Sequence, residues 1–178
     1  MTLSERTLGD WLEHWAETTP DKEYIVYSDR NLRFTWKQFN ERVDDMAKGL
    51  MAIGVEKGTH VGLWAANVPD WLTILYACAK VGAVAVTVNT NYKQSELEYL
   101  CENSDMHTLC IVNGEKDSDF VQMTYTMLPE LRTCQRGHLK SERFPRMKNV
   151  VYIGQEKFRG MYNTPELLLL GSNIANDK

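Results

Sequence analysis

The sequence of 178 residues has no apolar run long enough to cross a membrane. A bilayer-spanning helix needs about 20 continuous apolar residues. The most apolar stretch, Leu72 to Val88, carries Lys80 near its middle and Gly82 directly after Val81. The opening residues, Thr2 to Asp10, are polar and mixed and lack the basic-then-apolar order of a secretory leader. These absences favour a cytoplasmic protein without a membrane span.

The sequence also lacks an excess of positive charge and any closely paired cysteines. Its net charge is −4 at pH 7, whereas nucleic-acid binding needs a basic face for phosphate contacts. The four cysteines show no C-x-x-C spacing, and two of them lie in apolar runs, where a free thiol behaves as a small buried hydrophobe. This usage favours a reducing compartment over a disulfide framework. The cysteines are Cys78, Cys101, Cys110 and Cys134.

A metal site is not indicated either. The pairs His107/Cys110 and Cys134/His138 give a loose metal-like pattern, but structural zinc sites usually show tighter paired spacing. Cys110 also lies in the apolar run LCIV, and a strand points neighbouring side chains to opposite faces. We therefore assign no metal ligand.

Phosphate-binding loops and nucleophile motifs are absent as well. The strand expected at His60–Ala65 is followed by ANVPDW rather than by a G-x-G-x-x-G loop. Neither G-x-x-x-x-G-K-[ST] nor G-x-S-x-G occurs anywhere. The carboxylates of Asp44-Asp45 and of Glu96/Glu98 fit solvated helix faces. From the residues alone, this is an α/β chain without a visible catalytic centre.

What the sequence does contain is a regular alternation of helix and strand patterns. Hydrophobic periodicity and turn residues together define the expected elements. The predicted helices are Thr7–Thr19, Thr35–Gly54, Pro69–Val81, Ser95–Glu102, Asp117–Met127 and Thr164–Gly171. The predicted strands are Glu23–Tyr27, Leu32–Thr35, His60–Ala65, Ala83–Val88, Thr108–Val112 and Asn149–Gly154.

Polar residues predict where several helices start. Thr35 and Gln38 form a capping box, and Ser95 and Glu98 form a second one. Asp117 can cap the helix that follows it. We expect these side chains to satisfy the backbone N–H groups that the first turn leaves unpaired.

Two further segments carry specific expectations. Trp11 and Trp15 share one stripe of the first helix, and this spacing predicts that both dock onto the core. The segment Arg132–Lys148 is polar, basic and poorly periodic, which predicts a long loop. The rest of the chain shows no internal repeat.

The order of strands and helices between His60 and Val112 is a βαβαβ unit. Right-handed crossovers place its helices over a parallel sheet. Ala83–Val88 is apolar at nearly every position, which is typical of a central strand covered on both faces. The sequence therefore predicts an α/β fold, a Rossmann-like parallel sheet flanked by helices. Its core covers residues 34–112, and residues 113–178 are less regular.

The stretch from Phe34 to Val112 also carries a series of short motifs in a fixed order. They are F-T-W-x-x-F at a helix start, G-V-E-K-G-T-H-V before a strand, N-V-P-D-W opening a helix, K-V-G-A-V, V-N-T-N-Y, and E-L-E-Y-L-C-E-N-S-D. Their order and spacing resemble the N-terminal region of the adenylate-forming, AMP-dependent enzymes. Within that group the sequence is most similar to the fatty acyl-CoA synthetases.

This resemblance implies a parent enzyme that activates a fatty acid with Mg-ATP as an acyl-adenylate and then transfers the acyl group to CoA. The phosphate loop of such enzymes usually follows a strand shortly beyond the point where this sequence stops. The resemblance thus implies that residues 1–178 are a fragment, the first lobe of a large domain. It has no catalytic residue and no cofactor site of its own, and is inactive alone because nothing in it stabilises charge on a transferring phosphate.

The resemblance also suggests one candidate site. In related enzymes the loop after the matching strand lies near the channel for CoA and the acyl substrate. The matching residues here are Asn89, Thr90, Asn91 and Tyr92, and ligands of open α/β sheets gather beyond the carboxyl ends of strands. A plain polar connection is the alternative interpretation. Lys116 is either a partner for CoA phosphates or a solvated lysine.

Two other functions remain open at this point. One is a stand-alone Rossmann-like module that binds a nucleotide or CoA, and the other is a paralogue that acts only through protein contacts. For a lobe cut from a larger protein we also expect self-association through an exposed apolar face.

Overall fold

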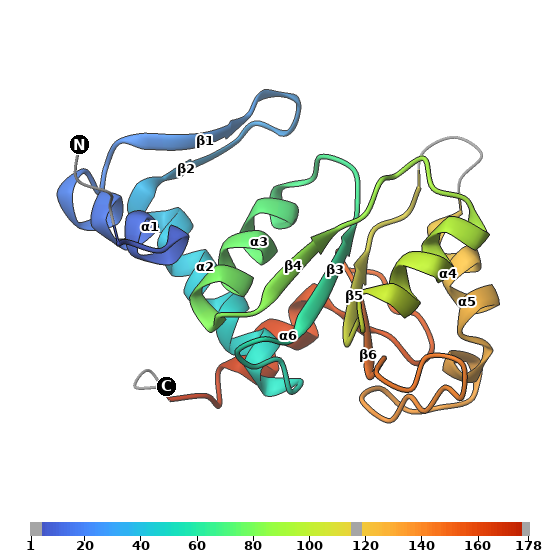
Figure 1. Ribbon diagram of the computed structural model, residues 1–178. Coiled ribbons are helices and arrows are strands. Elements are labelled where there is room, and N and C mark those ends of the chain that lie inside the picture. Colours follow the sequence, from blue (N-terminus) through green and yellow to red (C-terminus); the bar gives the residue numbers. More distant parts are fainter. Residues whose placement is uncertain (1–4, 115–118, 176–178) are drawn as a thin grey trace.

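The structure, a computed structural model, describes residues 5–114 and 119–175. Helix α1 (Leu8–Thr18) opens it, followed by an antiparallel hairpin of β1 (Glu23–Tyr27) and β2 (Leu32–Thr35). The hairpin lies at one end of the molecule (Figure 1). Thr7 and Asp10 cap α1 reciprocally: the Asp10 N–H donates to the Thr7 hydroxyl at 3.1 Å, and the Thr7 N–H donates to the Asp10 carboxylate at 2.7 Å.

Helix α2 (Trp36–Ala52) begins at the capping box predicted from Thr35 and Gln38. It leads into β3 (His60–Trp64), α3 (Pro69–Val81) and β4 (Val84–Thr87). Gly82 ends α3 at a φ of +78°, a conformation in which a residue with a side chain would be strained. Each boundary follows the predicted one to within a residue or two.

The second half adds helices α4 (Gln94–Asn103), α5 (Phe120–Met127) and α6 (Thr164–Gly171) and a short 3₁₀ helix at Pro129–Arg132. Its strands are β5 (Thr108–Ile111), β6 (Asn149–Tyr152) and the two-residue β7 (Tyr162–Asn163). The segment between the 3₁₀ helix and β6 contains neither helix nor strand, as predicted.

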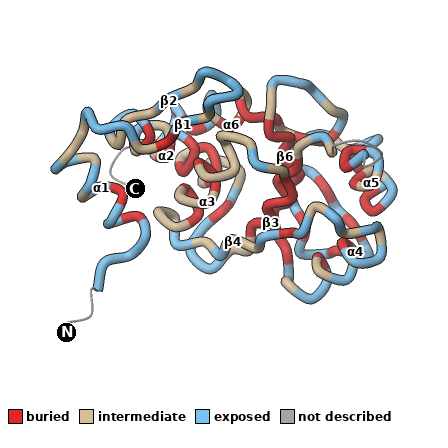
Figure 2. Tube along the Cα trace, turned by 90° about the horizontal axis from the view of Figure 1, so that it is seen from above, coloured by how far each residue is buried: buried red, intermediate tan, exposed pale blue. Residues whose placement is uncertain are grey.

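The five-stranded sheet has the order β4-β3-β5-β6-β7, and every pairing in it is parallel. The predicted α/β fold with a parallel sheet flanked by helices is therefore confirmed. The buried residues follow the sheet and the helix faces turned toward it (Figure 2). They form two hydrophobic cores, one on each side of the sheet.

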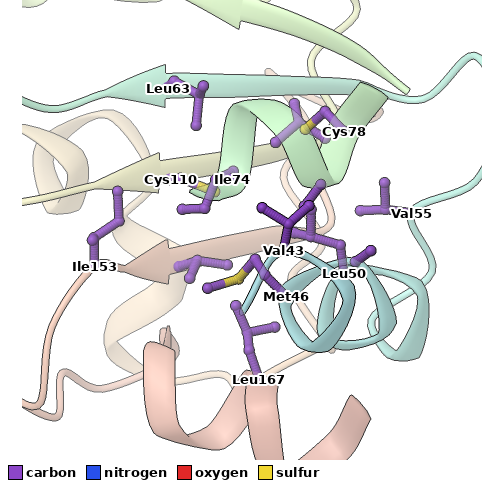
Figure 3. Packing of buried hydrophobic residues seen from close by; sticks show 14 of the residues in the cluster. Val43, Met46, Leu50, Val55, Leu63, Ile74, Cys78, Cys110, Ile153 and Leu167 are labelled. Carbon is purple, nitrogen blue, oxygen red and sulfur yellow. The ribbon is translucent and has the colours of Figure 1, made fainter. Parts of the chain in front are cut away.

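The first core lies between the sheet and helices α2, α3 and α6 (Figure 3). Leu12 of α1 and Ile25 of the hairpin belong to it as well. Helical spacing on α2 supplies much of it, and these positions are almost fully buried. Its central side chains include Phe39, Val43, Met46, Leu50, Ile74 and Leu167. The close approach of α2 and α6 depends on glycine, since a Cβ on Gly171 would lie 2.6 Å from the backbone nitrogen of Gly49.

The second core lies on the opposite side of the sheet, under α4 and α5. Its helices contribute Leu97, Phe120 and Val121, but the loop before β6 contributes as well. Leu139, Phe144 and Met147 are buried although they belong to neither a helix nor a strand.

Four expectations need correction. The strand β4 is an edge strand rather than a central one, and Val84 is 45% exposed. Helix α4 begins at Gln94, where the Glu96 carboxylate accepts from the Lys93 N–H at 2.8 Å, so the predicted box of Ser95 and Glu98 is wrong.

The other two corrections concern a helix cap and a stripe of aromatic residues. Asp119 caps α5 by accepting from the Gln122 N–H at 2.7 Å, and the predicted cap, Asp117, lies outside the described residues. Trp11 and Trp15 remain 37% and 40% exposed, because the neighbouring Leu12 takes the buried position of α1. The prediction that both tryptophans dock onto the core is therefore wrong.

Candidate functional site

The loop after β4 lies at the carboxyl edge of the parallel sheet, where ligands of open α/β folds gather. It is shaped by one residue. The Asn89 side-chain oxygen accepts from the Asn91 N–H at 2.9 Å, and the Asn89 carbonyl accepts from the Tyr92 N–H at 3.1 Å. This local pairing is an Asx-turn, which fixes the backbone without helix or strand. The side chains of Asn89 and Asn91 are left exposed.

Tyr92 anchors this loop. Its ring is half-buried against the second core, while Thr90 is half-exposed in the middle of the turn. A shallow hollow of about 290 Å³ lies beside the ring, between the loop and the first turns of α4. It is lined by Tyr92, Ser95, Glu96, Tyr99 and Leu100. The hollow thus combines aromatic and apolar walls with a polar rim.

A second feature of the carboxyl edge was not visible in the sequence. Trp64, the last residue of β3, is fully buried and stacks on Phe120 with ring centroids 3.8 Å apart. Its indole Nε1 has no hydrogen-bond partner among the described residues. Nothing in the spacing of the sequence distinguishes this tryptophan from an ordinary core residue, because the missing acceptor is a property of the packed structure.

Among the described residues, the start of α3 is poorly suited to phosphate, and no group of side chains is suited to magnesium. Helix α3 begins where a dinucleotide fold would bind pyrophosphate, but Pro69 in its first turn has no N–H to offer. Asp70, in the same turn, adds negative charge and forms an ion pair with Arg42. Within residues 5–114 and 119–175, no three His, Cys, Asp or Glu side chains gather into a group that could hold a metal ion. We therefore derive no step of ATP chemistry from this chain.

A wider hollow, about 690 Å³, lies away from the carboxyl edge, between α1, α2, α3 and the segment after α6. Five carboxylates and three lysines contribute to its lining, and this excess of negative charge disfavours an anionic substrate such as a nucleotide, CoA or a fatty acid. The charged residues in it are Glu13, Glu41, Asp44, Asp45, Glu56, Lys48, Lys57 and Lys80. Size alone therefore does not identify the site.

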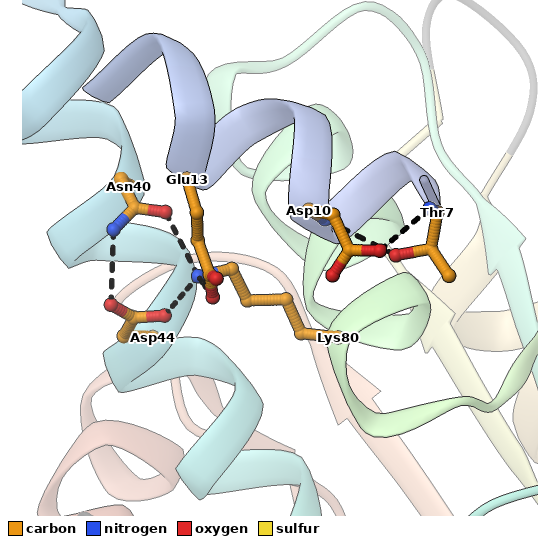
Figure 4. A network of polar contacts seen from close by, with 6 residues as sticks. All are labelled: Thr7, Asp10, Glu13, Asn40, Asp44 and Lys80. Carbon is orange, nitrogen blue, oxygen red and sulfur yellow. Dashed lines mark hydrogen bonds and ion pairs between the residues drawn. The ribbon is translucent and has the colours of Figure 1, made fainter. Parts of the chain in front are cut away.

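Lys80 has a structural role in that hollow (Figure 4). Its ammonium donates to Glu13 at 2.8 Å, to the Asn40 side-chain oxygen at 2.8 Å and to Asp44 at 2.6 Å. All three donors are thus used, and they join α1, α2 and α3. A Cβ on Gly9 would lie 3.1 Å from the Lys80 side chain, so α1 crosses α3 at close range.

Thiols are not available as nucleophiles. Burial raises the pKa of Cys78 and of Cys101 to about 12, and it also raises the pKa of Cys110. Cys134 is half-exposed, and its pKa is raised by partial burial as well. The neutral thiol is therefore the dominant form of all four at pH 7. Lys116, the alternative phosphate contact, lies outside the described residues.

Among the described residues, no helix combines the length and the apolar character needed to cross a membrane. The structural features described so far are the fold and a polar loop at the carboxyl edge of the sheet. The fold is a parallel five-stranded sheet flanked by helices.

Comparison with known proteins identifies the family. The family described as AMP-binding enzyme matches residues 12–165, which is most of the chain, so the chain belongs to this family. A Bacillus subtilis protein provisionally named acyl-CoA synthetase YngI is 41% identical over 174 residues, covering 98% of this chain and 32% of the relative. The mitochondrial medium-chain acyl-CoA ligase ACSF2 of Bos taurus is 34% identical over 174 residues, covering 98% and 28%.

Solved structures share the fold. The long-chain-fatty-acid-CoA ligase FadD1 of Archaeoglobus fulgidus superposes with a TM-score of 0.71 at 22% identity, covering 98% of this chain and 31% of that one. The N-terminal domain of FACL13 from Mycobacterium tuberculosis gives 0.69 at 19% identity, covering 96% and 37%. The 178 residues therefore span about a third of the length of the proteins that they match.

Proposed function

We propose that this chain is the N-terminal part of an ATP-dependent acyl-CoA synthetase, with residues 1–178 forming the first lobe of its large domain. The reaction converts a fatty acid, ATP and CoA to acyl-CoA, AMP and pyrophosphate. The family match over residues 12–165 is the observation that carries the proposal. The names of the relatives support the substrate class. ATP, Mg²⁺ and CoA are the cofactors and substrates of the whole protein.

The 178 residues alone are inactive in this proposal. Pro69 and Asp70 make the start of α3 unsuited to phosphate, and the described residues offer no other cradle for it. Stabilising the charge of a transferring phosphate needs preorganised donors or a metal ion. The lobe therefore supplies part of the walls of the site, and the remainder of the synthetase supplies the chemistry.

The loop Asn89–Tyr92 is the contribution of this lobe to the site. We place it at the edge of the channel for CoA and the acyl chain. Its position at the carboxyl end of β4 supports this placement, as do the exposed amides of Asn89 and Asn91. The pantetheine arm of CoA carries amide groups that such side chains can bind. The hollow beside Tyr92 offers an aromatic wall to the same ligand.

A chimaera tests the proposed function. This chain replaces the matched region of the Bacillus subtilis relative, and the product is assayed for AMP formation with ATP, CoA and fatty acids of six to sixteen carbons, a range that is roughly medium to long chain. We expect activity that requires both CoA and fatty acid, and none from the 178 residues alone. A soluble chimaera that is inactive, beside an active parent, contradicts the proposal. Submillimolar binding of ATP by the 178 residues contradicts the absence of a phosphate site.

The loop is tested in the same chimaera with Asn91→Ala and Tyr92→Ala. We expect each to raise KM for CoA by about 5–30-fold, because one or two hydrogen bonds or a ring contact are worth about 1–2 kcal/mol. The control is Asn173→Ala, an exposed residue beyond α6. An unchanged KM for both CoA and fatty acid in the two loop variants removes the loop from the site.

Two lesser proposals concern the chain on its own. Leu8, Trp11 and Trp15 are 46%, 37% and 40% exposed on one stripe of α1, which favours self-association through this apolar face. Sedimentation equilibrium on the 178 residues tests this, and a monomer at millimolar concentration contradicts it. Four free thiols suit a reducing compartment, and we propose the cytoplasm.

A further inference from the structure

The character of β4 does not suit its place in the sheet. Strands that are apolar on both faces are typical of the middle of a parallel sheet. The segment Ala83–Val88 has this character, yet β4 pairs with a neighbour on one side only, β3. As a result Val84 is 45% exposed and Thr87 is exposed as well. A strand with the composition of an internal strand thus lies at an edge.

The backbone of β4 is also arranged for a second partner. The N–H groups of Val84 and Val88 donate to carbonyls of the β3 segment, at 2.8 Å to Thr59 and 3.0 Å to Leu63. Because hydrogen-bonding directions alternate along a strand, the N–H and C=O groups of Ala85 and Thr87 point to the open side. These groups form a regular row of donors and acceptors without a partner strand.

The usual protection of an edge strand is missing. Natural edges carry charged residues, proline or bulges, or are very short. Val84–Thr87 has no charge and no proline, and its pairing with β3 runs in unbroken register. By contrast, the opposite edge strand, β7, has only two residues. The hairpin of β1 and β2 carries a bulge and the exposed ion pair of Arg33 with Glu23.

We propose that β4 is an internal strand of a wider sheet, and that its open edge is covered by an extended segment of the same polypeptide from outside residues 1–178. This inference rests on the proposed function. The occupant is chosen from length, because these residues span only 32% of the Bacillus subtilis relative and 28% of the Bos taurus one. The covering strand presents an apolar side chain to Val84 and backbone groups to Ala85 and Thr87.

Hydrogen exchange tests this pairing in the 178 residues and in the chimaera with the Bacillus subtilis relative. In the 178 residues, the amides of Ala85 and Thr87 exchange quickly, while that of Val84 is protected by Thr59. In the chimaera, we expect the first two to slow by about 100-fold or more, since paired strand amides open only with larger structural units. Equal rates of these two amides in both proteins overturn the proposal.

A matched pair of proline variants adds a second readout. Val84→Pro removes the bonded N–H, whereas Thr87→Pro removes one that points to the open side, and both side chains are exposed. In the 178 residues we expect a lower thermal midpoint for Val84→Pro and little change for Thr87→Pro. In the chimaera both lower the midpoint. A chimaera that tolerates Thr87→Pro contradicts a covering strand.

The outcomes separate this proposal from the proposed function. Protection of Ala85 and Thr87 in an inactive but folded chimaera leaves the strand pairing standing and removes the enzyme activity. An active chimaera in which the amides of Ala85 and Thr87 are unprotected supports the enzyme activity and removes the strand pairing. Protection that appears in the 178 residues alone and disappears on dilution assigns the edge to a second copy, and so overturns the proposal. Should the chimaera be insoluble, the same exchange is measured on the aligned strand of the full-length relative.

Discussion

The two cores on either side of the sheet are built by different means. The first core is filled mainly by helices α2, α3 and α6, whose buried side chains recur every three or four residues. The second core is covered by helices α4 and α5 and also by the loop that precedes β6. Leu139, Phe144 and Met147 are as well buried as the residues of α2. Burial is thus similar on the two sides, while the supporting backbone is mainly helical on one side and partly a loop on the other.

This difference has an energetic consequence. A helix holds its side chains on a frame of hydrogen bonds, so a deleted side chain leaves a cavity that closes poorly. A loop can move into such a cavity and recover part of the lost contacts. We therefore expect the same substitution to be more destabilising in the first core than in the second.

The largest effect is expected for Phe39→Ala in the first core compared with Phe144→Ala in the second. Phe39 is 1% exposed on α2, with the rings of Tyr24 and Tyr76 at 5.3 and 5.6 Å. We expect a loss of about 4–5 kcal/mol in the free energy of unfolding for Phe39→Ala and about 2–3 kcal/mol for Phe144→Ala. Urea unfolding measures both.

Two results would contradict this contrast. Equal losses would mean that the loop before β6 is as rigid as α2. A larger loss for Phe144→Ala would mean that the second core limits the stability of the molecule. Lys140→Ala, an exposed neighbour on the same loop, is the control and should change stability little.

The same contrast explains how much of the fold could be predicted from the sequence. The first core was predictable because its residues follow helical periodicity, as the capping box of Thr35 and the spacing from Phe39 to Leu50 illustrate. Phe144 and Met147 lie in a polar, basic segment without period, so their burial was not predictable. Their positions depend on contacts across the sheet, which local patterns do not encode.

The prediction that Ala83–Val88 is a central strand was wrong for a related reason. Apolar character predicts which faces of a strand are covered, but it does not predict the order of strands in a sheet. The loop Asn89–Tyr92 follows β4 as strand and turn signals indicate, while its part in a binding site stays a prediction. Its shape, set by the Asn89 side chain, and the unpaired Nε1 of Trp64 became visible only in the folded chain.

A second pair of variants compares glycines on the two sides. A Cβ on Gly171 would meet the backbone of Gly49 at 2.6 Å, and neither helix can yield without separating α2 from α6. A Cβ on Gly62 would meet the sulfur of Met106 at 2.5 Å, but this flexible side chain can move. We expect about 1–3 kcal/mol of destabilisation for Gly171→Ala and less than about 1 kcal/mol for Gly62→Ala. Equal effects in thermal unfolding would show that Met106 is as fixed as the α2 backbone.

The ion pairs give a third and smaller contrast. Lys80 is mostly buried at 11% exposure and joins three helices, whereas Arg143 is 53% exposed and pairs with Glu98 and Glu102 on α4. We expect Lys80→Met to cost about 1–2 kcal/mol, because it frees two half-exposed carboxylates from their partner. Arg143→Met should shift the midpoint less. Lys80→Arg keeps the positive charge and serves as the control. A larger loss of stability for Arg143→Met than for Lys80→Met in 0.1 M salt would contradict this contrast.

The smallest expected effect is a pH dependence of stability that arises from His107, next to the start of β6. Burial lowers the pKa of His107, and the nearby Lys148 lowers it further. In the unfolded chain His107 has a pKa near the ordinary value of 6.5. Just below that pH it therefore binds a proton in the unfolded chain but less so in the folded chain. Stability is complete above pH 6.5 and decreases as the pH falls from 6.5 toward the lower folded pKa. The His107 carbonyl accepts from the N–H groups of Lys148 and Asn149, which links this residue to the start of β6. We expect His107→Gln to flatten the thermal midpoint between pH 7 and 5.5, a range set roughly by the ordinary histidine pKa. A wild-type midpoint that rises on acidification over this range would show that the folded chain takes up the proton, and with it that His107 is not held neutral.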